Sequence, residues 1–145
     1  MTGMPPREPH RDGTTARVRM RAIPASIHEA RQLVDELCAR VGLDGSARAD
    51  VALAVSEAMT NAVCHGYRNG QTGDIDVSAT VEGDELVVII RDYGVGPILH
   101  PEAPGLGMGI QVMSELATEC HVVPAEPGTA ATLRFKTTST HSPRD

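Results

Sequence analysis

A carboxylate, a carboxamide and an imidazole recur at every fourth position in the segment SEAMTNAVCHGYRNG, residues 56–70: Glu57, Asn61 and His65. Because residues i and i+4 are neighbours on a helix surface, Glu57 and Asn61 can contact one small ligand together. The Asn61 oxygen suits Mg²⁺, which takes few protein ligands and keeps water and phosphate oxygens in its shell. A Glu57 carboxylate left free of metal can accept a proton from an attacking hydroxyl group.

The ordinary alternative is that these residues form the wet face of an amphipathic helix. Periodicity predicts a helix over residues 46–65 whose apolar arc lies opposite Glu57 and Asn61. The arc consists of Val51, Val55, Ala58, Met59, Ala62 and Val63. Asparagine is unfavourable inside a helix, because its side chain competes for backbone hydrogen bonds. Asn61 therefore weighs against the wet-face interpretation, and the ligand role depends on a phosphate site and a base pocket elsewhere in the chain. His65 can either contact phosphates or simply finish the helix.

The segment LVVIIRDYGVG, residues 86–96, predicts a buried strand that ends in a carboxylate and two glycines. Asp92 at the strand exit can accept a hydrogen bond from an exocyclic amino group such as that of adenine. Gly94 and Gly96 would let the backbone pass close to a ligand. Taken alone, the D-x-G pattern is also that of an ordinary turn.

A second glycine-rich segment, PGLGMGIQVM at residues 104–113, places Gly105, Gly107 and Gly109 directly before a predicted short helix. Free backbone N–H groups at a helix start form an anion site, although a flexible loop with a helix cap has the same pattern. The segment is not a Rossmann fingerprint, because Ile110 stands where the third glycine is needed. It is not a Walker A loop either, because the chain has no G-K-[ST] sequence.

Composition excludes several classes of protein. The 145 residues allow one domain, 41% of them are hydrophobic, and the net charge of −6 with one Phe and two Tyr argues against nucleic-acid binding. Three widely spaced cysteines without a CxxC pair predict reduced thiols in the core and no zinc framework. The sequence has no apolar run of about 18 residues and no signal-peptide core, so we expect a cytoplasmic protein without a membrane segment.

The periodicity predicts an α+β, two-layer sandwich between two disordered ends. We expect a disordered arm at residues 1–15, a domain at 16–136 and a disordered tail at 137–145. Within the domain, a strand near residue 16 precedes a helix that we expect Ser26 to cap and Gly42 to close. Two hairpins are also predicted, one with its turn near Gly83 and one at the end of the domain.

The order of the motifs is more specific than any one of them. E-x-x-x-N on a helix, D-x-G-x-G after a strand, G-x-G-x-G before a helix and Gly128-Thr129 before a last strand resemble the Bergerat-fold, or GHKL, ATPases. Within that superfamily the chain most resembles the anti-sigma factor serine/threonine kinases of the RsbW and SpoIIAB type. EAMTNAVCHGY matches their N box, RDYGVG their first glycine box and GMGIQVM their second. The resemblance covers about residues 16–136.

This resemblance implies a fold and a set of roles. The sheet would be mixed and mostly antiparallel, with helices on one face. Glu57 would be the general base, Asn61 the Mg²⁺ ligand and Asp92 the carboxylate that reads adenine. The remaining nucleotide-binding residues would be Gly94 and Gly96 around the adenine, Gly105 in the second glycine box, Gly107, Met108 and Gly109 along the phosphates, and Thr129 beside the adenine.

The implied function is that of an ATP- and Mg²⁺-dependent protein-serine kinase. Such a protein forms a homodimer, sequesters a sigma factor and phosphorylates a serine of a STAS-type anti-sigma antagonist. A non-catalytic sigma-binding module is the main alternative, favoured because no Lys or Arg occurs between Asp92 and Leu133. In a kinase without such a cation, Mg²⁺, backbone N–H groups and an arginine, either Arg68 or one from the dimer partner, would have to stabilise the charge of the phosphates. A detached sensor-kinase domain is a third alternative, for which we would expect a dimerisation helix pair.

Overall fold

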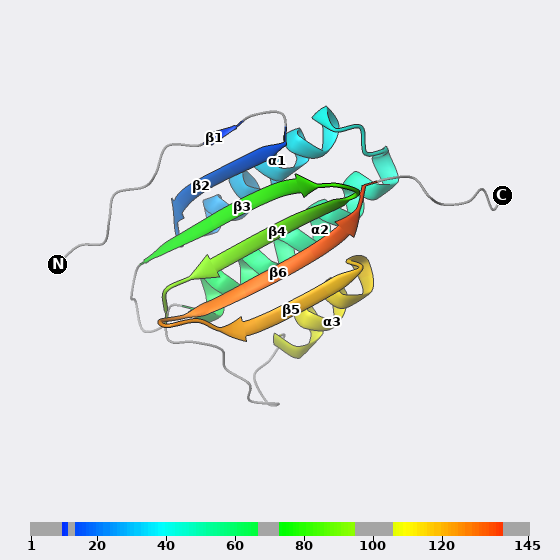
Figure 1. Cartoon of the computed structure of the whole chain (residues 1–145). Helices are drawn as coiled ribbons and strands as arrows, with labels where there is room; N and C mark the ends of the chain where they lie inside the picture. Colours follow the sequence, from blue (N-terminus) through cyan, green and yellow to red (C-terminus); the bar gives the residue numbers. More distant parts are fainter. Residues whose placement is uncertain (1–9, 12–13, 67–72, 95–105, 138–145) are drawn as a thin grey trace.

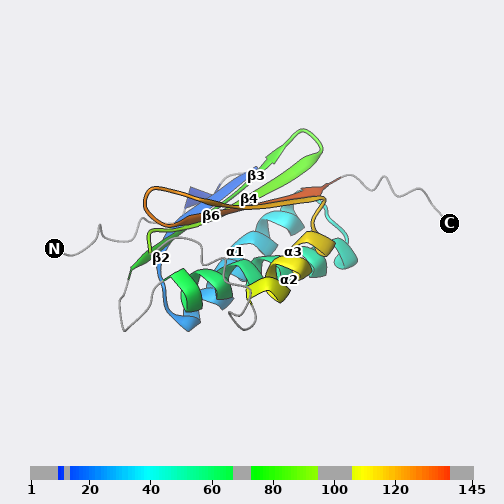
Figure 2. The ribbon, with the colours of Figure 1, turned by 90° about the horizontal axis from the view of Figure 1, so that it is seen from below.

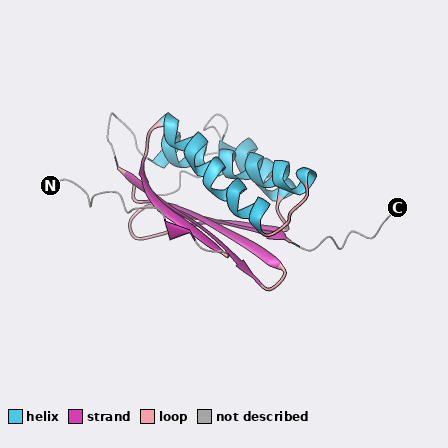
Figure 3. Cartoon of the chain, turned by 90° about the horizontal axis from the view of Figure 1, so that it is seen from above, coloured by secondary structure: helices cyan, strands magenta, loops and turns pink. Residues whose placement is uncertain are grey.

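A six-stranded sheet carries the helices of this protein on one of its two faces (Figure 2, Figure 3). The computed structural model describes residues 10–11, 14–66, 73–94 and 106–137. The strand order is β1-β2-β3-β4-β6-β5, and every neighbouring pair is antiparallel (Figure 1). The strands are β1 (His10–Arg11), β2 (Thr15–Arg21), β3 (Asp74–Glu82), β4 (Glu85–Asp92), β5 (Glu119–Pro124) and β6 (Thr129–Lys136). The predicted α+β sandwich with helices on one face is confirmed, but the sheet was predicted to be mixed and its described strand pairs are all antiparallel.

The helix layer consists of three α-helices and one π-helical turn in the described residues: α1 (Pro24–Arg40), α2 (Gly45–Asn61), η1 (Ala62–Gly66) and α3 (Leu106–Leu116). Helix α2 lies between α1 and α3 and contacts both of them. Its buried side chains pack with the apolar faces of the sheet and of the other helices into one core. None of the described helices has the length and the apolar character needed to cross a membrane.

Strand alternation gives the sheet one apolar and one polar face. In β3, Ile75, Val77 and Ala79 are buried toward the helices, while Asp76 and Ser78 between them are only partly buried. Successive side chains of a strand point to opposite faces, so Asp76 lies on the face that none of the described helices covers. The turn between β3 and β4 places Gly83 at a φ of 62°, as the predicted hairpin requires.

The start of α1 differs from the prediction. Pro24 is the first helical residue and Ile23 the N-cap, with no side-chain cap. Ser26 lies inside the helix, buried, and its Oγ donates a hydrogen bond to the Arg21 carbonyl oxygen at 2.6 Å. Proline has its φ fixed near the helical value and lacks an N–H that needs a cap, so the helix begins three residues earlier than predicted. Gly42, at a φ of 89°, follows the end of the helix as predicted.

Two further expectations meet the structure only in part. Most of the predicted arm at residues 1–15 lies outside the described residues, but His10–Arg11 pair with β2 and Thr15 begins that strand. Cys38 is buried, and burial raises the pKa of its thiol to about 12. The prediction that all three cysteines are core residues is wrong for Cys64, which lies exposed in η1.

Candidate functional site

The last two turns of α2 carry the carboxylate and the carboxamide of the predicted site. Glu57 and Asn61 are both partly buried, on the side of α2 away from the buried Val55 and Met59. Asp44 caps the other end of this helix by accepting a hydrogen bond from the Ala47 N–H at 2.8 Å. Helix α2 therefore holds both polar side chains at one end of a rigid, core-packed element.

A π-helical turn follows Asn61 directly. The predicted α-helix to His65 is wrong here, because α2 ends at Asn61 and Ala62–Gly66 form η1. This turn contacts β4, whose end carries Asp92. Single π-turns occur mostly within α-helices and are frequent at functional sites. Ala62, Val63 and Cys64 are ordinary helix residues, so the periodicity of the sequence gave no signal for the wider turn.

The second glycine box lies against Glu57 and Asn61. Helix α3 begins at Leu106, so Gly107, Met108 and Gly109 lie in its first turn and not in a loop before it. A Cβ atom built on Gly109 would lie 3.3 Å from Glu57 Oε1 and 3.3 Å from Asn61 Oδ1. The absence of a side chain at 109 thus lets the N–H groups at the start of α3 approach both polar groups closely.

Asp92 is the buried acid of the site. Its side chain is 4% exposed at the end of β4, and its Oδ1 accepts a hydrogen bond from the Gly94 N–H at 3.0 Å. Burial raises the pKa of the Asp92 carboxyl, while hydrogen bonds from the backbone N–H groups of Gly94 and Thr129 and the charge of Arg91 act in the opposite direction. A buried carboxylate so held is preorganised to accept one more hydrogen bond from a ligand.

Thr129 and its neighbour Gly128 form the wall next to Asp92. Thr129 is the register partner of Asp92 in the pair of β4 and β6. A Cβ atom on Gly128 would lie 2.0 Å from the Asp92 carbonyl oxygen, and the φ of Gly128 is 96°. Only glycine allows this approach of the turn to β4. Sequence reasoning named Gly128 only as the start of a strand, although a glycine before a strand is a signal of close backbone contact.

Comparison with known proteins identifies the family. The histidine kinase-like ATPase domain family matches residues 20–135. The chain belongs to this family. The resemblance to the RsbW and SpoIIAB type, inferred from the three motifs, is confirmed by relatives and by a solved structure.

The similar curated proteins are anti-sigma F factors. The one from Shouchella clausii is 38% identical over 93 residues, which are 57% of this chain and 63% of the relative. The one from Clostridium kluyveri is 40% identical over 75 residues, 44% of this chain and 52% of the relative. The chain thus spans between half and two thirds of the length of these relatives.

A solved structure has the same fold. The RsbU and RsbW domains of a Mycobacterium tuberculosis protein match 84% of this chain and 32% of that chain, with a TM-score of 0.68 and 27% identity. The predicted Gly96 and Gly105, as well as Arg68, lie outside the described residues, and the side chain of Met108 is not described. The other predicted site residues form two groups, one around Gly109 and one around Asp92.

The residues around Gly109 fit a Mg²⁺ ion that is bound together with phosphates. Among the described residues, no cluster of three or more His, Cys, Asp or Glu side chains can hold a metal by itself. Mg²⁺ needs no such cluster, because it keeps water and phosphate oxygens in its shell. In this histidine kinase-like domain the Asn61 oxygen borders the space that a Cβ at 109 would fill. A carboxamide oxygen is a ligand type that suits Mg²⁺, so Asn61 is the residue that would hold such an ion.

We expect Gly109→Ala to lower the affinity for Mg²⁺-ATP about tenfold or more. An overpacked contact costs about 1–3 kcal/mol, because the neighbouring groups must move to make room for the added methyl group. The new methyl group would occupy the space in front of Glu57 and Asn61. The matched control is Gly45→Ala in α2, where a Cβ meets nothing within 4 Å. Calorimetric titration of both variants with Mg²⁺-ATP checks the prediction, and equal affinities would contradict it.

We expect Gly128→Ala to destabilise the domain by about 3 kcal/mol or more, because strain at positive φ and a backbone clash add up. Gly42→Ala separates the two contributions. Its φ of 89° is close to that of Gly128, but a Cβ there meets nothing within 4 Å. Gly42→Ala should therefore cost only about 1 kcal/mol. Urea unfolding of both variants measures the difference, and similar midpoints would show that the approach to Asp92 is unimportant.

Proposed function

We propose that this chain is an ATP-dependent protein-serine kinase and an anti-sigma factor. In this proposal it sequesters a sigma factor and phosphorylates a serine of a STAS-type antagonist. It acts in the cytoplasm as a homodimer. The family supports ATP chemistry in general, and the names of its relatives support an anti-sigma role. The observation that carries the proposal is the approach of Gly109 to the Glu57 carboxylate and the Asn61 carboxamide.

The two groups of site residues would divide the nucleotide between them. Asp92 would accept a hydrogen bond from the adenine amino group, with Gly94 and Thr129 fixing the carboxylate. The first turn of α3 would direct its N–H groups at the phosphates. Asn61 would hold Mg²⁺, which when bound neutralises charge on the phosphates. Glu57, beside this space, would take the proton of the attacking serine hydroxyl.

Titration of ATP with and without Mg²⁺ tests the nucleotide site. We expect Mg²⁺ to raise the affinity of the wild type about tenfold or more, an increment of about 1.4 kcal/mol, and Asn61→Ala to lose that increment. Thr60→Ala is the control on the same helix, since the Thr60 hydroxyl only donates to the Ser56 carbonyl oxygen at 2.7 Å. An increment that persists in Asn61→Ala would remove the metal role, and a wild type that binds no ATP would remove the kinase.

The partner proteins need a separate test. Purified sigma factors and STAS-type proteins of the same organism are incubated with the chain, and complexes are separated by size-exclusion chromatography with ATP or ADP. We expect one sigma factor to co-elute with the chain and one antagonist to become phosphorylated on serine. A sigma complex without any phosphorylation would favour the non-catalytic module, and phosphorylation of histidine would favour a sensor-kinase domain.

A further inference from the structure

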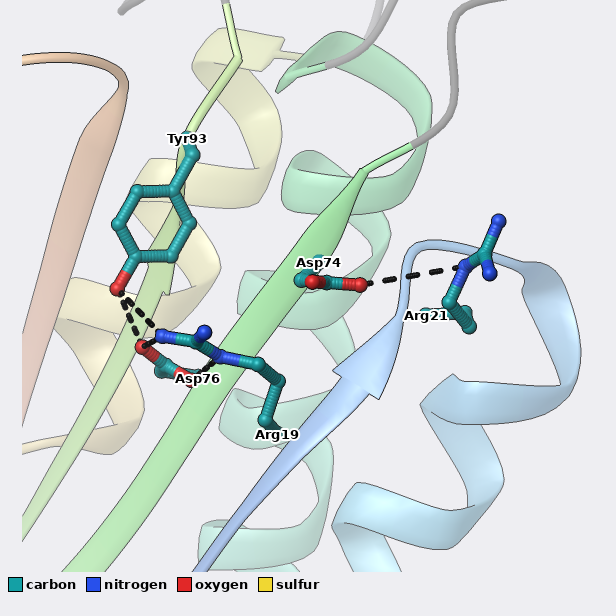
Figure 4. Close-up of polar contacts among 5 residues, drawn as sticks. All are labelled: Arg19, Arg21, Asp74, Asp76 and Tyr93. Atoms are coloured by element: carbon teal, nitrogen blue, oxygen red, sulfur yellow. Dashed lines mark hydrogen bonds and ion pairs between the residues drawn. The ribbon is translucent and has the colours of Figure 1, made fainter. Parts of the chain in front are cut away.

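A cluster of polar and aromatic side chains lies on the sheet face that carries no helices, directly behind Asp92. Tyr93 follows Asp92 in the chain, so its side chain points to the opposite face of β4. Its hydroxyl donates a hydrogen bond to Asp76, and Arg19 reaches the same hydroxyl oxygen at 3.3 Å (Figure 4). Tyr93, which follows β4, thereby connects the end of that strand to Asp76 in β3 and Arg19 in β2.

The base of this cluster is a buried ion pair. Arg19 is only 5% exposed although no helix covers it, and its Nε and Nη2 donate to Asp76 Oδ1 and Oδ2 at 2.7 and 2.8 Å. This bidentate pairing with Asp76 raises the pKa of Arg19 further above its ordinary value. Burial raises the pKa of the Tyr93 phenol, with Asp76 acting in the same direction. The phenol therefore stays a proton donor at neutral pH.

Arg91 links this cluster to the wall of the site. Its guanidinium stacks on the Tyr93 ring at 4.3 Å from the centroid, and its Nη2 donates to the Pro127 carbonyl oxygen at 2.9 Å. Pro127 precedes Gly128, whose missing side chain lets the turn lie on the Asp92 backbone. One arginine thus joins the strand that carries Asp92 to the turn that carries Thr129.

The placement of Arg91 has a cost in folding free energy. Its Nε is buried and has no hydrogen-bond partner among the described residues. A buried donor left without a partner destabilises the folded state, and such local costs are found mainly at functional sites. The arrangement keeps the two N–H groups that hold the Asp92 carboxylate, those of Gly94 and Thr129, in a fixed relation.

We infer that Arg91 and Tyr93 are positioning residues for base recognition. They act from the open face of the sheet, through the backbone, on the Asp92 carboxylate that faces the adenine. The inference rests on the proposed nucleotide site. Because small displacements of a positioned group cost much affinity, loss of this support should weaken the binding of adenine. It should also reduce the discrimination between adenine and guanine.

The test compares the dissociation constants of ATP and GTP for the wild type, Arg91→Ala and Tyr93→Phe. We expect Arg91→Ala to lower ATP affinity about tenfold and to lower the GTP-to-ATP ratio of dissociation constants, because a displaced Asp92 discriminates less. Tyr93→Phe loses only one hydrogen bond and should lower ATP affinity about two- to fivefold. A purely structural role would reduce the folded fraction but would leave the ratio unchanged.

Arg134→Ala is the matched control, because Arg134 lies on the same open face and pairs with Glu85 at 3.1 Å, away from Asp92. It should leave both dissociation constants unchanged. If Arg91→Ala does not fold, Tyr93→Phe decides the question alone. Wild-type ratios in the folded Arg91 and Tyr93 variants would overturn the inference while the nucleotide site stands. A wild type that binds neither nucleotide would overturn both proposals.

Discussion

Replacing Glu57 with Gln is expected to lower the rate of phosphoryl transfer to the antagonist about 10²–10⁴-fold, the usual contribution of a general base. The affinity for Mg²⁺-ATP should stay within about twofold of the wild type, because Gln keeps the volume of Glu and the ion is assigned to Asn61. Gln cannot take the proton of the serine hydroxyl at neutral pH. Single-turnover transfer of labelled phosphate, together with calorimetric titration, separates the two effects.

A matched carboxylate makes this prediction specific. Glu115 lies exposed on α3, the helix that packs against α2 and carries Gly109 toward Glu57. Glu115→Gln removes the same charge and should leave the transfer rate unchanged. A transfer rate in Glu57→Gln above about one tenth of the wild type would assign the base to another group, because a general base contributes at least about 10²-fold.

Local sequence patterns predicted the parts of the site that depend on one element at a time. The period of α2 places Glu57 and Asn61 on one face, and the apolar run of β4 predicts the buried exit at Asp92. The hairpin at Gly83 follows from turn chemistry. Each of these features is decided by residues close together in the chain, so a single sequence contains the information.

The remaining features depend on contacts between segments far apart in the chain. Packing between elements decides how closely Gly109 approaches α2 and Gly128 approaches β4. The hydrophobic periodicity of a single segment does not predict such contacts. The same holds for the Arg19–Asp76–Tyr93 cluster, which joins three strands through register. Arginine and aspartate on alternate strand positions indicate only a solvated face. The burial of Arg19 depends on its contact with Tyr93, which only the folded structure shows.

Replacing Asp92 with Asn is expected to lower the affinity for ATP about 10–100-fold. The carboxylate accepts hydrogen bonds from the Gly94 and Thr129 N–H groups and would accept a third from adenine. An asparagine amide has only one oxygen, so its NH₂ group must face one of these three donors. A buried donor left unpaired costs about 1–3 kcal/mol, which gives the expected loss of affinity. Titration with Mg²⁺-ATP measures it, and an affinity within twofold would reject Asp92 as the adenine acceptor.

Stability as a function of pH gives this variant a second, independent signature. Burial raises the pKa of Asp92 in the folded state above its unfolded value, so the wild type gains stability relative to Asp92→Asn as the pH falls from neutral toward the unfolded pKa. Asp35 is the control of opposite sign, because hydrogen bonds from Arg48 lower its folded pKa. The wild type should lose stability relative to Asp35→Asn at lower pH, as the pH falls below the unfolded pKa toward the lowered folded pKa, and Asp35→Asn should bind ATP normally. Urea unfolding between neutral and acid pH measures the free energy of unfolding of the wild type and of both variants. If the curves of wild type and Asp92→Asn run parallel with pH, the folded state does not raise the pKa of Asp92.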